Sequence, residues 1–339
     1  MRRIAAGLAA GLALAWASAA SAQEVNLKYS NWLPANYFIV EKIMKPWIAD
    51  VERVTEGRVT VDILPKVVGT VAGQYDVLSD GLADLSLWVP GYSPGRFQLM
   101  EGFDLPFLGS DPYDRSVAIW QTYEKFIADT PELENIHVVS VFSSNSAHPV
   151  TKGKRMLTPA EFAGARLRTS SPASAQMVEI MGGTAVTKPF SELYEMAAGG
   201  IVDGATIPLD TIPGFKLNDV FDTVSLIRGG LTNSVLVVGM NKAKWDQISE
   251  ADRKAIDEVS GEAMAKLSGQ VHREGLESTM KMLHEGGTTF YESSEEEYAA
   301  IKTALRPIWD DWISRAKEKG LADPEGFLAS MSAVTGDGY

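Results

Sequence analysis

Two successive series of alternating strand and helix patterns constrain the fold of this chain more than any other feature. The first series has strand patterns over residues 25–29, 59–64 and 84–89, separated by amphipathic helix patterns over residues 41–55 and 71–82. This β-α-β-α-β order predicts a parallel sheet with helices on both faces. A helix and a strand then extend the first series over residues 112–128 and 138–142.

A second series follows and has the same alternation. It comprises strands and helices in turn over residues 166–168, 173–181, 184–187, 191–198 and 204–207. Because 339 residues exceed what one hydrophobic core usually supports, we expect two α/β domains.

The last third of the chain begins with an apolar segment over residues 234–240, which is typical of a central strand. Beyond it the pattern is helical over residues 249–284 and 294–319. Long helices after two α/β series suggest that the C-terminal part packs on both domains.

The N-terminus has the layout of a signal peptide. Arg2 and Arg3 precede an apolar run over residues 4–17, and the small residues Ala20, Ser21 and Ala22 follow it. A membrane anchor is the alternative, but the run is too short to span about 30 Å of hydrocarbon. We therefore expect residues 1–22 to be removed on export, which leaves a protein that is not embedded in a membrane.

Composition excludes several classes of site. The chain has no cysteine, which excludes disulfides, thiolate metal sites, iron–sulfur clusters and cysteine nucleophiles. Its formal net charge of −13 argues against a surface built for nucleic acid or anionic lipid.

The catalytic motifs in the sequence fail on physical grounds. Residues 91–95 match the G-x-S-x-G string of serine hydrolases, but the residue after the serine is Pro94, which has no N–H for an oxyanion hole. Gly182 and Gly183 precede a strand instead of opening a helix, the wrong context for a dinucleotide. No H-x-x-x-H or H-E-x-x-H pair occurs among the histidines, which are His137, His148, His272 and His284.

Two features of the predicted strand ends are candidates for ligand binding. Arg168 ends a short strand, where its guanidinium can make a bidentate contact with a carboxylate; the alternative is a surface ion pair. Aromatic residues follow the first and third strands, namely Trp32, Trp88 and Tyr92. Ligands of open α/β sheets bind beyond the carboxyl ends of strands, although core packing explains such aromatics equally well.

Several of these stretches resemble DctP-type solute-binding proteins of TRAP (tripartite ATP-independent periplasmic) transporters. In the first half the resemblance rests on five segments: KYSNWLP at 28–34, VERVTEGRV at 51–59, DGLAD at 80–84, YSPGRF at 92–97 and LPF at 105–107. In the second half it rests on EFAGARLR at 161–168, FSELY at 190–194 and GIVDG at 200–204. The matches cover nearly all of the expected mature chain in the family's order.

The resemblance implies a two-domain α/β periplasmic-binding-protein fold, type II-like, whose chain crosses between the lobes. Domain I is expected at residues 23–143 plus about 232–270, and domain II at residues 144–231. Helices over about 271–339 are expected to pack on both lobes, mainly on domain II. Such a protein closes on an organic acid in the periplasm and delivers it to a TRAP membrane permease, without catalysis, cofactor or metal.

The family's carboxylate-binding arginine falls on Arg168. Departures from the family pattern bear on the rest of the ligand. His148 stands where some members that bind polar ligands have a second arginine, Ile207 where they often have an asparagine, and Trp88 where others have an acidic residue. Since these positions have become weaker or apolar, we expect a monocarboxylate with an apolar or aromatic body.

The full set of expected contacts follows from this interpretation. Polar contacts are expected from Arg168, Asn145, His148 and Asn233, and walls from Trp32, Trp88, Tyr92, Phe190 and Ile207. A C4-dicarboxylate ligand and ligand sensing for a receptor stay open as alternatives. A periplasmic enzyme on the same fold and an ABC-type binding protein are less compatible with the motifs.

Overall fold

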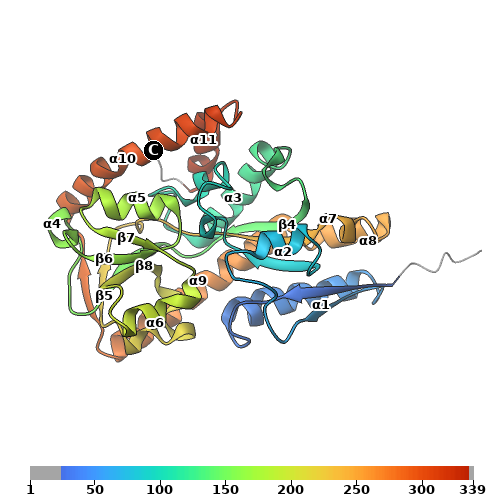
Figure 1. The fold of residues 1–339 in the computed structure, drawn as a ribbon, viewed down its shortest axis with the longest axis horizontal. Helices are drawn as coiled ribbons and strands as arrows, with labels where there is room; N and C mark the ends of the chain where they lie inside the picture. The colour runs from blue at the N-terminus through green and yellow to red at the C-terminus, as the bar shows by residue number, and fades with distance from the viewer. Residues whose placement is uncertain (1–23, 336–339) are drawn as a thin grey trace, which may run out of the picture.

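The computed structural model describes residues 24–335, so the expected signal peptide at residues 1–22 lies outside the described residues. Two mixed sheets organise this part of the chain (Figure 1). The first has the order β2 (Val59–Ile63), β1 (Val25–Ser30), β3 (Leu85–Trp88), β10 (Val235–Asn241) and β4 (Ile136–Ser143). The second has the order β11 (Thr289–Glu292), β9 (Thr223–Leu226), β5 (Ala147–Thr151), β8 (Gly204–Pro208), β6 (Arg166–Thr169) and β7 (Thr184–Thr187).

The helices occur between and after the strands, as the alternating pattern predicts. The shorter ones are α1 (Lys45–Val54), α2 (Gln74–Ser79), α4 (Pro159–Phe162), α5 (Pro172–Ile180), α6 (Leu193–Ala198), α7 (Lys242–Trp245) and α8 (Glu250–Glu258). The longer ones are α3 (Pro112–Phe126), α9 (Gly261–Glu285), α10 (Glu295–Glu318) and α11 (Pro324–Thr335).

Each sheet contains a strand that runs against its neighbours, which the prediction of parallel sheets missed. Strand β10 is antiparallel to both β3 and β4, and β5 is antiparallel to both β8 and β9. These strands lie next to two short segments that pass between the sheets, residues 144–146 and 227–234; a third, longer passage runs from β10 through α9 to β11. The two segments also bond to each other: the Ser144 N–H donates to the Ser234 carbonyl at 2.9 Å, and the Leu231 N–H to the Ala147 carbonyl at 2.9 Å. The lobes are therefore joined by a paired connection.

The helix expected over residues 249–284 is two helices, because Ser260 is extended and separates α8 from α9. The Ser260 hydroxyl accepts a hydrogen bond from the indole N–H of Trp47 on α1 at 3.0 Å. This bond occupies Ser260 and fixes the break against the core. Strands β5, β9 and β11 and helices α7 and α11 had no counterpart in the sequence patterns.

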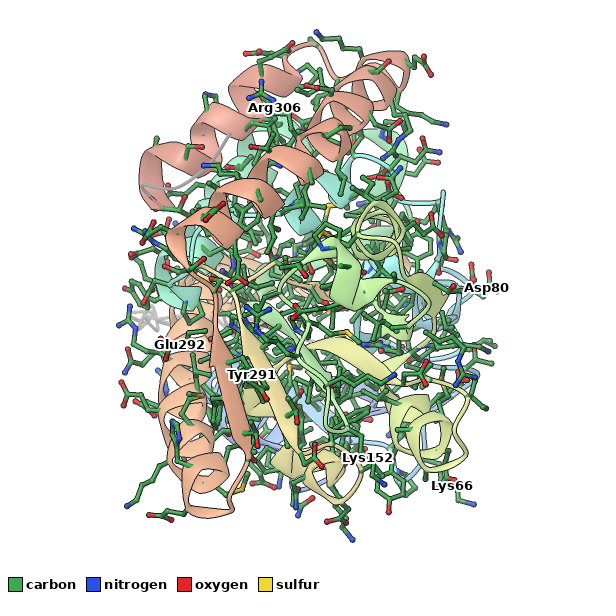
Figure 2. The ribbon with its side chains drawn as sticks, turned by 90° about the vertical axis from the view of Figure 1, so that its left-hand side faces the viewer. Lys66, Asp80, Lys152, Tyr291, Glu292 and Arg306 are labelled. Atoms are coloured by element: carbon green, nitrogen blue, oxygen red, sulfur yellow. The ribbon has the colours of Figure 1, made fainter. Side chains whose placement is uncertain are left out.

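The C-terminal helices contact both halves of the molecule. Helix α9 packs on α3 and β4 and also reaches residues 209–211 of the second half, while α10 packs on α5 and α11 on α3. Figure 1 shows α10 extending over α5 toward α11. Strand β11 forms the edge of the second sheet, where Tyr291 and Glu292 lie on the outside of the molecule (Figure 2).

The contact between α9 and α3 depends on a glycine. A Cβ atom on Gly269 would lie 2.3 Å from the Tyr113 Cα and 2.9 Å from the Pro112 carbonyl oxygen. We predict that Gly269→Ala lowers the free energy of unfolding by about 1–3 kcal/mol, because backbone must move to admit the methyl group.

Urea denaturation measures this loss, and Gly275→Ala on the same helix is the matched control. A Cβ at Gly275 would meet the Asp210 Cβ at an ordinary 3.6 Å. Alanine there is expected to be neutral or to stabilise by up to about 1 kcal/mol, because it favours helix over glycine. Equal stability of the Gly269 variant and the wild type would contradict the close packing.

Candidate functional site

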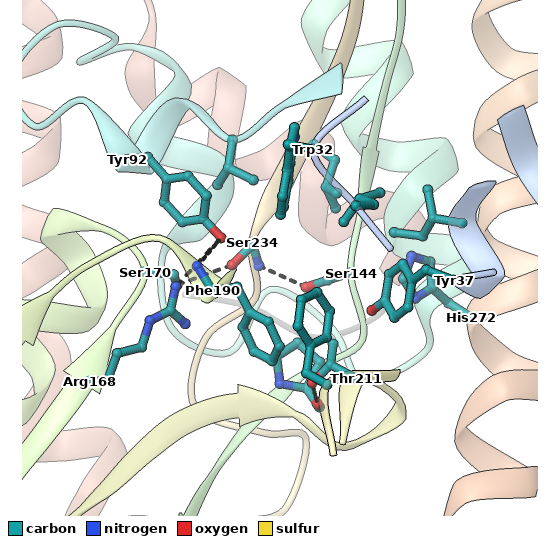
Figure 3. A pocket seen from close by; sticks show the side chains of 16 residues that line it. Trp32, Tyr37, Tyr92, Ser144, Arg168, Ser170, Phe190, Thr211, Ser234 and His272 are labelled. Atoms are coloured by element: carbon teal, nitrogen blue, oxygen red, sulfur yellow. Dashed lines mark hydrogen bonds between the residues drawn. The ribbon is translucent and has the colours of Figure 1, made fainter. Parts of the chain in front are cut away.

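A cavity lies between the two sheets, beyond the carboxyl ends of β1, β3, β6 and β8, where α/β sheets place their ligands. Figure 3 shows the side chains around it. The lining comprises Trp32, Leu33, Tyr37, Ile39, Val89, Tyr92, Ser144, Arg168, Ser170, Phe190, Pro208, Thr211, Phe215, Ser234, Leu236 and His272.

Arg168 is a buried cation in this lining. Its side chain is 1% exposed, and its Nε donates a hydrogen bond to the Lys188 carbonyl at 2.8 Å. Aromatic rings flank the guanidinium, with centroids 5.2 Å (Phe190) and 5.9 Å (Tyr92) from its Cζ. Burial lowers the pKa of Arg168, because the cation has lost its water. Of its two Nη groups, one lies 3.5 Å from the Tyr92 hydroxyl oxygen, and the other has no hydrogen-bond partner among residues 24–335.

Strand β6 explains why Arg168 is buried while Arg166 is not. The two arginines are two residues apart and share a face of the sheet, whereas Leu167 points to the opposite face and is fully buried. Arg166 lies at the outer start of the strand and pairs with Asp203 at 3.0 Å. Across residues 24–335, by contrast, no carboxylate lies within ion-pair distance of Arg168.

Tyr92 connects the two lobes directly above this arginine. It belongs to a short 3₁₀ helix after β3 (Pro90–Tyr92), and its hydroxyl oxygen accepts the Phe190 backbone N–H at 3.1 Å. An Nη atom of Arg168 lies 3.5 Å from the same oxygen. The backbones meet closely here, since a Cβ on Gly91 would lie 2.7 Å from the Ser170 carbonyl oxygen. The lobes are thus in contact across the cavity.

The walls between the polar groups are largely aromatic. The Trp32 indole N–H donates to the Leu87 carbonyl at 2.8 Å, which fixes the ring against the first sheet. The ring of Phe190 lies 4.5 Å from that of Phe215, and Phe215 lies 5.2 Å from Tyr37, measured between centroids. These rings form a continuous apolar surface that suits an apolar ligand body.

Of the nine residues selected from the sequence, the structure brings Trp32, Tyr92, Arg168 and Phe190 together around the cavity. The polar residues among the others have partners elsewhere. Asn145 donates to Asp210 and to the His272 carbonyl, both at 2.7 Å, and Asn233 donates to the Phe103 carbonyl at 2.8 Å. His148 accepts the Ile227 backbone N–H at 3.2 Å. In this structure these three side chains bond to other parts of the protein and do not line the cavity.

The two apolar residues outside the lining belong to cores. Trp88 is 2% exposed and packs against Tyr75, with ring centroids 6.0 Å apart, while Ile207 is fully buried in the apolar cluster that also contains Phe190. Their neighbours Val89 and Pro208 line the cavity instead. Adjacent residues of an extended chain point to opposite sides, so each expectation identified the segment but not the side.

Sequence reasoning missed several lining residues. Tyr37 follows the first strand in an aromatic-rich stretch, which was a usable signal, but Thr211 and Phe215 lie in short 3₁₀ turns after β8 that no pattern in the sequence marks. His272 lies within the 25-residue helix α9, where nothing in the helical pattern distinguishes it. Within residues 24–335 no group of His, Asp and Glu side chains is arranged to hold a metal ion.

Comparison with known proteins identifies the family. The family described as bacterial extracellular solute-binding protein, family 7 (DctP), matches residues 29–315. The chain belongs to this family. Members of the DctP family are periplasmic, substrate-binding proteins of transporters and not enzymes. Among the described residues, no helix has the length and apolar character needed to cross a membrane.

Similar proteins cover almost the whole chain. The "Outer membrane transporter protein TsaT" of Comamonas testosteroni is 29% identical over 93% of this chain and 94% of that protein. A TRAP periplasmic solute-binding protein of Bordetella bronchiseptica, solved with bound mandelate, has a TM-score of 0.88 and 29% identity over 92% of this chain and 99% of that one. A marine metagenome protein described as specific for aromatic acids, solved with metahydroxyphenylacetate, has a TM-score of 0.86 and 28% identity over the same shares. The fold is therefore the two-domain periplasmic-binding fold of this DctP family.

The environment of His148 predicts a pH dependence of stability. Burial lowers the pKa of His148 from 6.5 to about 4 in the folded protein, and burial also lowers that of His137 to about 4. The unfolded chain therefore binds more protons than the folded protein between these values. We predict that these two histidines add no pH dependence to the free energy of unfolding above about pH 6.5. Below that, their contribution lowers the free energy of unfolding as the pH decreases toward 4.

Denaturation at a series of pH values measures this slope. His148→Asn retains an acceptor for the Ile227 N–H and removes one titrating ring, so its slope should be smaller but not zero, because His137 remains. A variant whose slope equals that of the wild type would show that His148 titrates normally.

Proposed function

We propose that this DctP-family protein captures an organic monocarboxylate with an apolar or aromatic body and delivers it to a TRAP permease. The observation that carries the proposal is Arg168, a buried cation that lines the cavity and forms no ion pair with a carboxylate of residues 24–335. A lone buried charge is costly, and a bound carboxylate would offset that cost by bidentate hydrogen bonding.

The remaining lining supports an apolar ligand body. Arg168 is the only arginine or lysine among the lining residues, and most of the others are aromatic or aliphatic. The hydroxyl groups of a sugar acid that found no partner there would cost about 1–3 kcal/mol each. A second carboxylate, as in a C4-dicarboxylate, would lack a second guanidinium at the cavity wall.

The solved relatives support the same ligand class. At 28–29% identity, the Bordetella protein holds mandelate and the marine protein holds metahydroxyphenylacetate, each a carboxylate on an aromatic body. The contacts of Tyr92 with Arg168 and Phe190 indicate how binding favours closure, because a carboxylate at Arg168 would lie where both lobes meet.

The role of Arg168 can be tested by substitution. We predict that Arg168→Ala weakens mandelate binding by about 2–5 kcal/mol in isothermal titration calorimetry, as when one member of a buried charge pair is removed. Arg166→Ala is the matched control, since it removes the same side chain from the same strand at an exposed position. Its affinity should equal that of the wild type. Near-normal binding by a folded Arg168→Ala protein would refute the assignment.

The ligand class can be tested by a thermal-shift screen. Benzoate, mandelate and phenylacetate are expected to raise the Tm of the wild type, because ligands that bind only the folded state stabilise it by mass action. Succinate and glucuronate at equal concentration should leave it unchanged. Stabilisation by succinate or glucuronate but by none of the aromatic acids would contradict the proposal.

A further inference from the structure

A cluster of buried polar side chains lies at the end of the cavity away from Arg168, as Figure 3 shows for His272. Asp210 belongs to a 3₁₀ turn after β8 (Leu209–Thr211), and its Oδ2 is 2.7 Å from the His272 Nδ1. The same Oδ2 accepts the amide N–H of Asn145 at 2.7 Å. His272, Asp210 and Asn145 are respectively 1%, 4% and 1% exposed.

The cluster contains buried acceptors that no described residue satisfies. The atoms without a partner are the His272 Nε2, the Asp210 Oδ1 and the Asn145 Oδ1. A carboxylate can only accept, so the Nδ1 of His272 carries the proton that is donated to Asp210. In the neutral imidazole the Nε2 is then an acceptor. His272 lines the cavity, and the Asp210 Oδ1 and Asn145 Oδ1 beside it can only accept, so a hydrogen-bond donor would satisfy this end.

The charges around the cluster disfavour a second ligand carboxylate. Asp210 is itself anionic, and a nearby carboxylate would repel it. The guanidinium of Arg115 is buried and interacts with Asp210. Its N–H groups donate hydrogen bonds to Ser143, Ser144, Ser146 and Gly109, in and beside the crossing segments. A neutral donor such as a hydroxyl group fits this end better than an anion.

We propose that His272 is a specificity-determining residue, whose Nε2 accepts a hydrogen bond from a hydroxyl group on the ligand body. The ligand class is then a hydroxylated aromatic monocarboxylate, with its carboxylate at Arg168 and its hydroxyl at His272. This inference rests on the proposed function and refines it. Asp210 and Asn145 act through His272, because they fix its tautomer and orientation.

Binding of matched ligand pairs to the wild type tests the inference. The 3- and 4-hydroxyphenylacetates are compared with the fluorophenylacetates of the same substitution, since fluorine occupies space but does not donate. At least one hydroxy acid should bind roughly 3- to 10-fold tighter than its fluoro partner, the range expected for one neutral hydrogen bond. Equal or weaker binding of both hydroxy acids would overturn the inference while leaving the proposed function intact. Failure of all four acids to bind would overturn both.

The variant His272→Asn assigns the preference to this residue. Its side-chain amide can still donate to Asp210 from the position of Nδ1, but it has no equivalent of Nε2. The preference for the hydroxy acid over its fluoro partner should fall to within about 2-fold. A preference that survives in this variant would overturn the inference. Independently of the variant, the ¹⁵N shift of the His272 Nε2 in the wild type should move on binding the hydroxy acid and not on binding the fluoro acid.

Discussion

The proposed binding depends on one buried guanidinium, that of Arg168, which forms no ion pair with a carboxylate of residues 24–335. Arg168 is held by one backbone carbonyl and lies beside two aromatic rings, which are weak substitutes for the water that it has lost. The strand that carries it is the centre of this arrangement: Leu167 anchors β6 in the core, so the next residue must face the cavity. In the proposed function, a carboxylate ligand would complete an ion pair with Arg168.

This local charge would allow an acidic protein to bind an organic acid, as proposed. The chain has a formal net charge of −13, which at long range repels an anion. Near the cavity, however, neighbouring surface charges are neutralised in pairs, such as Arg166 with Asp203 and Lys188 with Glu192. Glu192 also acts on Arg168, but only from beyond ion-pair distance, and in a low-dielectric cavity the guanidinium acts strongly at short range.

The sequence predicted the alternating order of elements and the strand that carries Arg168, because hydrophobic periodicity and capping are local properties. It did not predict which crossing strands run antiparallel, since direction depends on where the chain re-enters a sheet. The prediction of site residues made the same error at four positions: it selected the neighbour of a residue that lines the cavity. Trp88, Ile207, Asn145 and Asn233 all lie outside the cavity, while the adjacent Val89, Pro208, Ser144 and Ser234 line it. The sequence predicts which segments reach the cavity, but tertiary packing determines which residue of each segment faces it.

His272 illustrates a different limit. Its contribution depends on Asp210 and Asn145, which are 62 and 127 residues away in the chain, and no local pattern connects them. These residues come together only because helix α9 packs beside the loops of both lobes.

A crystal structure of the protein with bound mandelate tests the central claim most directly. We predict that both carboxylate oxygens of the ligand lie about 2.7–2.9 Å from guanidinium nitrogens of Arg168, with the phenyl ring between the aromatic walls. A structure in which mandelate occupies the cavity with its carboxylate away from Arg168, or in which a protein carboxylate pairs with Arg168 instead, would contradict it.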